Sequence, residues 1–474
     1  MHMMKWAGEK GLACLLLVFA VGAYSLPAGA QNLDEVLTKT YETNPSLAAA
    51  RSGMYAAVEQ LPQAQAGYLP KISVQGTEGR SRVKQRTKDT NALGSEIQGV
   101  NKTLIDRSLE LDLSLNLYQG GQTMAATSAA EANVAKSLAQ FHTTEQKVLL
   151  DATTSYAAIG LYQSLARMAN ERNRELERLR AWANDMYAHQ QITITSVADV
   201  DTQIASANTN NTSIQSQLRT AKSRYLAVTG LMPESIEQWP GLPSLPASRD
   251  EAASLAMKNN PSIQQAAYAL QASEQEINRL DGTLLPSVDA YSLIKRDWNK
   301  SRFTGINDYT EHAREDTWSV GLNVTMPIFE GGLQYAQIRE AKQLYVQSQH
   351  QLIDATRSVL AQVEEQWDAL QTAKAQRING EAMKKAASIA LNGYKRQLKN
   401  GTSTIQDVLD SHGKFIDALT AIEQADHDVF IAKANLLAAI GVFGAQQLNL
   451  PVSQFDSESL ISSARFRWIG TGIE

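Results

Sequence analysis

Apolar and polar residues alternate strictly along one stretch in each half of the chain. In the first half the apolar positions are Leu109, Leu111, Leu113, Leu115 and Leu117, separated by Glu110, Asp112, Ser114 and Asn116. In the second half they are Val320, Leu322, Val324, Met326 and Ile328, separated by Gly321, Asn323 and Thr325. This alternation predicts strands at about 108–118 and 318–329, each with one apolar and one polar face.

Shorter alternating stretches precede both strands and predict further strands at about 71–79 and 287–296. Each half would then contribute one hairpin, and strands of roughly ten residues are typical of a transmembrane β-barrel. The alternative is a four-stranded sheet with one buried face, but no segment is an obvious cover for that face. Four strands cannot close a barrel, and strand edges cannot stay unpaired in hydrocarbon. The membrane interpretation, which we favour, therefore requires an oligomer.

Four stretches without proline, at 122–188, 194–229, 333–399 and 402–440, are rich in Ala, Gln, Glu, Leu, Lys and Arg and predict helices. Within the first, apolar residues recur at intervals of three and four, as in a helix packed along one seam. The longest of these helices would extend about 100 Å. A soluble coiled-coil rod is one interpretation, but the strands favour a membrane protein.

The chain is a tandem duplication. Asn44-Pro45-Ser46 recurs as Asn260-Pro261-Ser262, and Tyr118-Gln119-Gly120-Gly121 has its counterpart in Phe329-Glu330-Gly331-Gly332. The first repeat is expected to span 31–232 and the second 250–442. A proline-rich linker at 233–249 joins them, and a tail at 443–474 follows.

Residues 1–30 have the pattern of a secretory signal peptide, with lysines, an apolar stretch and Ala28-Gly29-Ala30 as the cleavage site. The only cysteine, Cys14, would leave with it, so the mature chain is expected to contain no disulfide or thiolate metal site. Among 474 residues, 44 are Lys or Arg and 49 are Asp or Glu, and this balance provides no field for binding nucleic acid. These features predict an exported protein.

The combination of a signal peptide, a duplicated hairpin-and-long-helix unit and paired Gly-Gly strand ends resembles the TolC family of outer-membrane efflux and secretion ducts. The resemblance covers Leu33 to about Val442. Its most specific motif runs from Gly401 to Asp410 (GTSTIQDVLD) and is similar to the family's second helix tip. The stretch from Thr193 to Val200 (TITSVADV) is the counterpart in the first half, with Thr193 where the family often has glycine.

The resemblance implies a mainly α fold with a small β part. In a homotrimer, twelve strands would form one outer-membrane barrel and twelve long helices a tunnel across the periplasm. The implied function is a passive exit duct of a tripartite export system, working with a periplasmic adaptor and an inner-membrane ABC or other pump. We favour type I protein secretion because no lipid-attachment cysteine is present. The alternative is the outer-membrane factor of a multidrug or metal efflux pump.

Three aspartates are the candidate gate of this duct. The resemblance assigns Asp407 and Asp410 to carboxylates facing the pore axis, and Asp199 to closing contacts of the first tip. The family's basic partner for Asp199 falls here on Ser403, which carries no charge. N-terminal helix capping is an alternative role for Asp407 and Asp410, and it explains one of them better than both. The tip residues Thr193, Val200, Gly401 and Val408 would dock the adaptor.

The strand parity assigns the apolar face to outer-membrane lipid, with the lipid-facing residues Leu109, Leu111, Leu113, Leu115, Val320, Leu322 and Val324. If the strand that carries Ile72 continues outward without a bulge, a basic belt lies on the same side. It comprises Arg80, Arg82, Lys84, Arg86, Lys88, Arg296, Lys300 and Arg302. We expect this belt to meet lipopolysaccharide phosphates; a solvated loop is the alternative.

The sequence contains no set of residues suited to catalysis, and we expect neither enzyme activity nor a cofactor or structural metal. The seven histidines include no His-x-x-x-His pair. Asp426-His427-Asp428 is the nearest to a constellation, but consecutive helical residues point in different directions. A structural coiled coil and an exported hydrolase remain the rival functions, and the hydrolase lacks a nucleophile or metal set.

Overall fold

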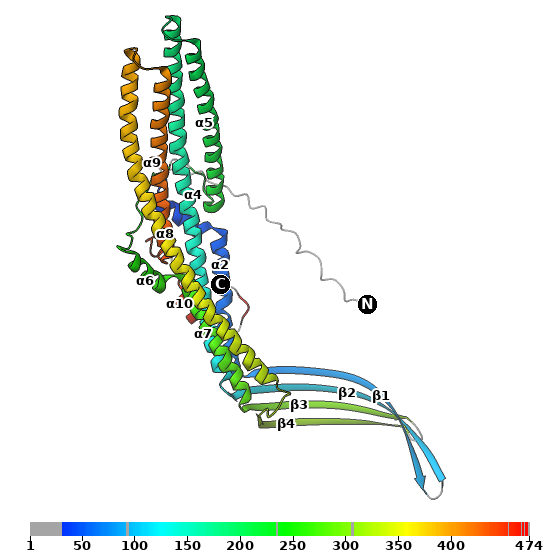
Figure 1. Cartoon of the computed structure of the whole chain (residues 1–474). Coiled ribbons are helices and arrows are strands. Elements are labelled where there is room, and N and C mark those ends of the chain that lie inside the picture. Colours follow the sequence, from blue (N-terminus) through cyan, green and yellow to red (C-terminus); the bar gives the residue numbers. More distant parts are fainter. Residues whose placement is uncertain are drawn as a thin grey trace, which may run out of the picture.

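The computed structural model describes residues 31–474 except for 92–93, 234–235, 305–307, 454, 466, 469 and 473–474. For residues 85–91, 94–100 and 457 it describes the backbone alone. The predicted signal peptide, with Cys14, lies outside the described residues. The molecule is elongated, with a curved sheet at one end and two helix tips at the other (Figure 1).

The two repeats have corresponding elements, with one exception. The first contains α1 (Leu33–Thr43), α2 (Pro45–Val58), α3 (Gln60–Gln65), β1 (Lys71–Asn91), β2 (Gly94–Gln119), α4 (Gln122–Ala188) and α5 (Ile194–Thr229). The second contains α6 (Arg249–Asn259), α7 (Pro261–Asp281), β3 (Ser287–Thr304), β4 (Tyr309–Thr325), α8 (Leu333–Lys399) and α9 (Ile405–Ala439). The exception is that two helices of the first repeat, α2 and α3, stand where the second has the single helix α7. A short helix, α10 (Ser457–Ala464), lies in the C-terminal tail.

The repeated Asn-Pro-Ser motif begins a helix and fastens it to another. The Asn44 side chain accepts a hydrogen bond from the backbone N–H of Ser46, while its amide donates to the Val228 carbonyl at 2.9 Å. Asn260 caps α7 in the same way and donates to the Ala439 carbonyl at 2.8 Å. Each motif therefore joins the start of one helix to the end of the returning helix, α5 or α9.

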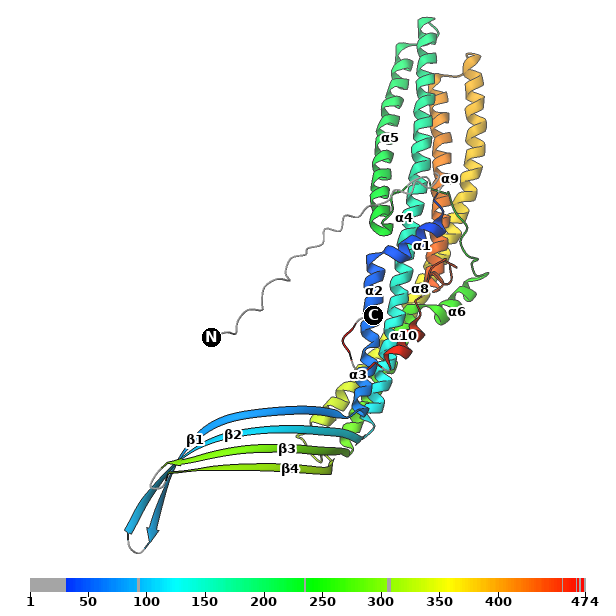
Figure 2. The same ribbon diagram turned by 180° about the vertical axis from the view of Figure 1, so that it is seen from behind.

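The paired glycines form the turn from strand to long helix. Gly120 and Gly121 have φ angles of 58° and 81°, and Gly331 and Gly332 have 63° and 83°. These left-handed conformations are disfavoured for residues with a Cβ atom. The second glycine of each pair is the N-cap of the long helix, α4 or α8. The glycine pairs thus allow the abrupt change of direction seen between the sheet and the helices (Figure 2).

The four strands form one antiparallel sheet in the order β1-β2-β3-β4, and β2–β3 pairing joins the two repeats. The strands are longer than the roughly ten residues expected, since β1 has 21 residues, β2 has 26, β3 has 18 and β4 has 17. Apolar residues alternate only in the part of each strand nearer the helices, whereas backbone pairing continues through the polar part beyond it. The expected strand 318–329 instead ends at Thr325, because Pro327 has no N–H for the ladder.

The long helices α4 and α8 run from the sheet to the tips, where α5 and α9 return beside them, while α2 and α7 line their lower parts (Figures 1 and 2). The largest apolar cluster lies near mid-length and contains residues of both repeats, among them Tyr41, Tyr156, Tyr225, Leu370 and Phe430. Burial raises the pKa of Tyr225 to about 12. In the part of the chain that the structure describes, no helix combines the length and apolar character needed to cross a bilayer.

Candidate functional site

The first helix tip connects α4 to α5 through residues 189–193. Gln190 has a φ of 61°, which turns the chain back, and Thr193 is the N-cap of α5. The Thr193 hydroxyl lies 2.6 Å from the Thr195 hydroxyl. Asp199 is exposed one turn into α5, and nearby Arg180 of α4 pairs with Asp201 at 2.7 Å. The tip therefore exposes the Asp199 carboxylate and the hydroxyls of Thr193 and Thr195.

The second helix tip connects α8 to α9 and is held by a capping box. Gly401 has a φ of 72°, and Thr404 is the N-cap of α9. The Asp407 carboxylate accepts hydrogen bonds from the Thr404 N–H at 2.9 Å, the Thr404 hydroxyl at 2.7 Å and the Ser403 hydroxyl at 2.9 Å. Ser403, which stands at the position of the family's basic residue, thus contacts Asp407 rather than Asp199.

The two candidate gate aspartates of this tip differ in environment. The hydrogen bonds from Thr404 and Ser403 lower the pKa of Asp407, so its carboxylate stays ionised while it caps the helix. Asp410 is exposed and accepts one hydrogen bond, from the Gln406 amide at 2.7 Å. The capping alternative therefore accounts for Asp407 and leaves Asp410 on the surface of the tip.

Val200 and Val408 do not offer a surface to another protein. Their exposed fractions are 0% and 1%, and they lie in one apolar cluster to which α4, α5, α8 and α9 all contribute. The sequence pattern predicts both at the adaptor-docking surface, whereas within the single chain their side chains are covered by these four helices. Each lies on the inner side of its helix, where it packs the two tips together, while Thr193 and Gly401 remain exposed.

A polar layer below the tips was not anticipated from the sequence. Lys395 of α8 pairs with Glu175 of α4 at 2.6 Å, which joins the two repeats and lowers the pKa of Glu175. His412 of α9 is buried beside them, and burial together with the positive charges of Lys395 and Arg172 lowers its pKa. The only signal in the sequence is the presence of charged residues in helices that otherwise pack through apolar seams.

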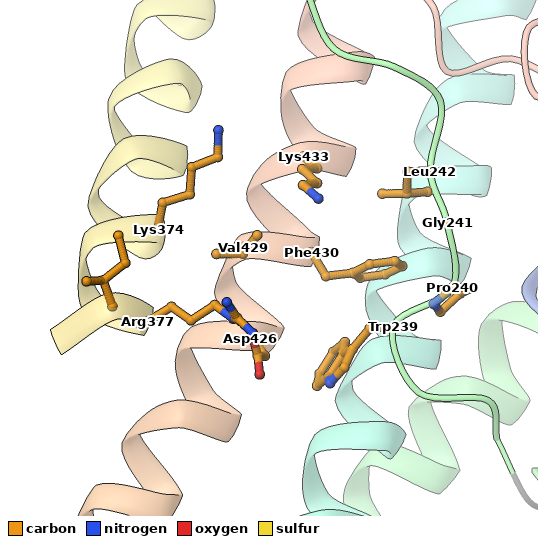
Figure 3. A pocket seen from close by; sticks show the side chains of 11 residues that line it. Trp239, Pro240, Gly241, Leu242, Lys374, Arg377, Asp426, Val429, Phe430 and Lys433 are labelled. Carbon is orange, nitrogen blue, oxygen red and sulfur yellow. The ribbon is translucent and has the colours of Figure 1, made fainter. Parts of the chain in front are cut away.

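A groove of about 650 Å³ lies where the linker crosses α8 and α9 (Figure 3). Its side chains include Trp239 and Phe430, whose rings are 5.9 Å apart. Asp426 forms an ion pair with Arg377 in this groove, whereas the neighbouring His427 contacts Asp428 at 2.9 Å. Asp426 thus engages Arg377 while His427 and Asp428 contact each other, so the three residues do not converge on one reacting atom.

The apolar strand residues share one face of the sheet. Directly opposed residues of antiparallel strands lie on the same face, and the register places Leu113 opposite Ile72 and Ser292, and Val324 opposite Val288. The exposed fraction on this face rises to 73% at Trp318, Leu111 is 38% exposed, and Leu115 is half-buried. The face is thus an uncovered apolar band in a single chain.

Comparison with known proteins gives matches along both repeats. The family profile described as "Outer membrane efflux protein" matches residues 36–231 and 252–442. The outer membrane efflux protein BepC of Brucella suis is 27% identical over 443 residues, which cover 93% of this chain and 92% of BepC. The outer membrane protein TolC of Escherichia coli is 23% identical over 456 residues, covering 93% and 88% of the two chains.

The matches include two proteins named for protease secretion. The alkaline protease secretion protein AprF of Pseudomonas aeruginosa is 25% identical over 215 residues, covering 45% of this chain and 44% of AprF. Among solved structures, the CmeC outer membrane channel of Campylobacter jejuni superposes with a TM-score of 0.72 at 16% identity, covering 92% and 89% of the two chains.

These matches confirm the predicted fold class, a duplicated long-helix unit whose hairpins complete a trimeric barrel, and the predicted location in the outer membrane with helices in the periplasm. The family consists of channel proteins rather than enzymes, and its trimers work with adaptors and inner-membrane pumps. The chain belongs to the outer membrane efflux protein family, the TolC family of outer-membrane channel proteins.

Proposed function

We propose that this channel is the passive exit duct of a type I protein secretion system, which includes a periplasmic adaptor and an inner-membrane ABC pump. The observation that carries the choice of cargo is the similarity to AprF, a protein named for protease secretion. BepC and CmeC are named as efflux or channel proteins. The second candidate is therefore the outer-membrane factor of a multidrug or metal efflux pump.

Deletion of the gene for this chain separates the two candidates. Type I secretion predicts that a protein disappears from the culture medium while sensitivity to toxic small molecules or metals stays unchanged. The efflux function predicts the reverse. Covalent cross-linking in intact cells, followed by purification of the trimer, would identify the adaptor and the pump. Recovery of a drug or metal pump in place of an ABC secretion pump would contradict our proposal.

We infer that the second tip forms the gate of this duct. In a trimer, Asp410 and Asp407 supply six carboxylates at the end of the tunnel, and Asp199 adds a negative charge from each first tip. The capping bonds of Asp407 favour its charged form, while Asp410 is exposed to passing ions. Charged rings of this kind select ions in pores and bind multivalent cations.

Planar-bilayer recording tests the gate. We expect Asp407→Ala with Asp410→Ala to give a folded trimer that selects less strongly for cations and is blocked less by multivalent cations added on the periplasmic side. A matched control, Asp34→Ala with Glu35→Ala, removes two exposed carboxylates from α1, far from the tips. We expect the control to conduct like wild type. Unchanged block in the gate variant would show that the constriction lies elsewhere.

We place adaptor docking on the exposed parts of the two tips, around Thr193 and Gly401. The buried Val200 and Val408 support these surfaces from inside, by packing the two coiled coils against each other. At the opposite end, the apolar face of the sheet contacts outer-membrane lipid and lipopolysaccharide. The proposal thus assigns one end of the molecule to protein partners and the other to the membrane.

A further inference from the structure

Four cations form two adjacent rows across the outer part of the sheet. The register aligns Arg80 with Ile105 and Lys300, and it aligns Arg82 with Thr103 and Arg302. Neighbouring strands are about 4.8 Å apart, and two residues along a strand span about 6.7 Å. The four positive side chains therefore arise from a patch of about 10 by 7 Å, which we call the cationic patch.

The cationic patch lies on the same face as the apolar band. Arg80 and Arg82 have the parity of Ile72 and Val74 on β1, and Lys300 and Arg302 have the parity of Val288 on β3. β1 pairs with β2 through this region without a bulge, so the alternative of a solvated loop is wrong for these residues. All four side chains are exposed, whereas Ser301 on the opposite face is buried.

On the side of the patch nearer the helices, the cations of this face have carboxylate partners, and those of the patch do not. Arg107 pairs with Glu78 at 2.8 Å, and Arg314 pairs with Asp316 at 2.9 Å. Within the described residues, no ion pair involves Arg80, Arg82, Lys300 or Arg302. The patch therefore carries positive charge that the chain does not compensate. The side chains of Arg86 and Lys88, which the sequence pattern places in the same belt, lie outside the described residues.

The position of the patch matches one surface of the membrane. From Val324 to Trp318 every residue of β4 on this side is apolar, which covers six residues, or about 20 Å of strand. At the 35–45° tilt usual in such barrels, these apolar rows rise about 15 Å, and the next two rows hold the paired charges of Arg296, Asp316 and Arg314. The exposed Trp298, opposite Arg314, lies at the upper edge of these rows. The patch begins one row beyond this edge, on the side away from the periplasmic helices.

We propose that the cationic patch binds the phosphate groups of lipopolysaccharide in the outer leaflet. This inference rests on the proposed membrane contact of the sheet and names its ligand. Arginine binds phosphate through two parallel N–H···O hydrogen bonds, and lysine adds a compact charge. Because the patch lies just outside the apolar band, it meets the phosphorylated head of a lipid whose acyl chains lie along Val74, Leu111 and Ile294. A trimer carries three such patches.

Lipopolysaccharide binding to the purified trimer in zwitterionic detergent tests this proposal. Native mass spectrometry measures bound lipid, and gel analysis measures the temperature of trimer dissociation. The test variant combines Arg80→Gln, Arg82→Gln, Lys300→Gln and Arg302→Gln. The control removes the same charge from exposed helical positions, with Arg174→Gln, Arg219→Gln, Lys222→Gln and Arg224→Gln. A third variant, Arg80→Lys with Arg82→Lys and Arg302→Lys, keeps the charge.

We expect lipopolysaccharide to raise the dissociation temperature of the wild type and the helical control. The apparent Kd for lipopolysaccharide should rise at least about tenfold in the test variant. The lysine variant should retain most of the binding. Equal binding to the test variant would overturn the proposal, and so would equal binding of dephosphorylated lipopolysaccharide. Equal binding of phosphatidylglycerol would overturn the choice of lipopolysaccharide.

Conductance separates this inference from the proposed function. The test variant should conduct like wild type in planar bilayers, because its changes lie on the outer face of the sheet. A wild-type trimer that binds lipopolysaccharide but does not conduct would contradict the duct and leave the patch intact. A further measurement adds inorganic phosphate as a competitor of bound lipopolysaccharide. If millimolar phosphate displaces the lipid as strongly as free lipopolysaccharide does, the patch is a general anion site and the proposal is overturned.

Discussion

Single side chains with two roles decide how the elements of this protein are joined. Asn260 caps α7 through its oxygen and fastens α9 through its amide, and Asn44 does the same in the first repeat. Asp407 both caps α9 and carries a charge at the tip. In each case the local role is visible in a short motif, whereas the second role depends on a partner far away in the chain.

We predict that Asn260→Ala lowers the free energy of unfolding by about 2 kcal/mol. Loss of the cap accounts for about 1 kcal/mol and the orphaned, buried Ala439 carbonyl for about as much. Asn260→Ser, which can still cap, should recover about half. The control is Asn32→Ala, which removes an exposed cap of α1 with a single 3.4 Å hydrogen bond. It should lower the free energy of unfolding by less than about 1 kcal/mol, half or less of the effect of Asn260→Ala. Thermal denaturation measures all three, and equal losses at both sites would contradict the double role.

The capping box predicts that the second tip loosens in acid. A lowered pKa means that ionised Asp407 stabilises the tip above its ordinary pKa of about 4, and this contribution is lost as the pH falls through its lower folded-state value. Amide protection in the 399–410 segment, measured by hydrogen exchange and corrected for intrinsic rates, should therefore decrease below about pH 4. Asp407→Ala should show low protection at every pH. Asp410→Ala, which leaves the box intact, should behave like wild type; if it instead matches Asp407→Ala, the assignment is wrong.

Among the elements, the strands extend further than their alternation of apolar and polar residues. The apolar alternation identifies the part of each strand that faces lipid, and the backbone ladder carries the hairpins well beyond it. The long helices α4 and α8 remain continuous, but the helices packed against them differ along their length. Their upper halves pack on α5 and α9, and their lower halves contact α7.

Strand parity predicts the outcome of introducing charge into the sheet. Leu113→Arg or Val324→Arg should destabilise the trimer by about 2–4 kcal/mol, because the arginine faces lipid near the bilayer midplane. Ser114→Arg and Asn323→Arg place the same charge on the opposite, polar face and should be tolerated. The measurement is the yield of trimer extracted from outer membranes. Equal losses from both faces would contradict the assignment of the lipid-facing side.

In the whole molecule, the two edge strands β1 and β4 are left unpaired, and the duplication indicates how they meet in the trimer. Within the chain, Asp112 of β2 lies opposite Leu293 of β3. The corresponding positions in the other repeats are Asn323 on β4 and Thr77 on β1. Repeat symmetry therefore predicts that Asn323 lies opposite Thr77 of the partner subunit.

Disulfide cross-linking checks this register. Opposed residues of antiparallel strands have Cα atoms about 4.5–5.5 Å apart, a separation that a disulfide spans. Asn323→Cys with Thr77→Cys should give covalent trimers on a non-reducing gel. No other thiol competes with the introduced pair, since Cys14, the one cysteine of the sequence, belongs to the predicted signal peptide. Asn323→Cys with Ser73→Cys, displaced by four residues, should remain uncross-linked. Efficient linkage in the displaced pair alone would show a different register.

The sequence by itself determines the features that depend on neighbours along the chain. The duplication, the proline-free helical stretches, the glycine pairs and the alternating strand faces all follow from local backbone preferences and from the periodicity of apolar residues. The family resemblance of the two tip motifs added the channel architecture, which the comparisons confirm.

Only the tertiary structure decides which side chains meet across distant segments. It buries Val200 and Val408 between the two coiled coils, pairs Lys395 with Glu175, and aligns Arg80 and Arg82 with Lys300 and Arg302. It also extends the strands past their apolar part, because backbone hydrogen bonds between strands do not depend on the apolar pattern. These features arise from helix packing and strand register, which are set by contacts between residues up to 220 positions apart.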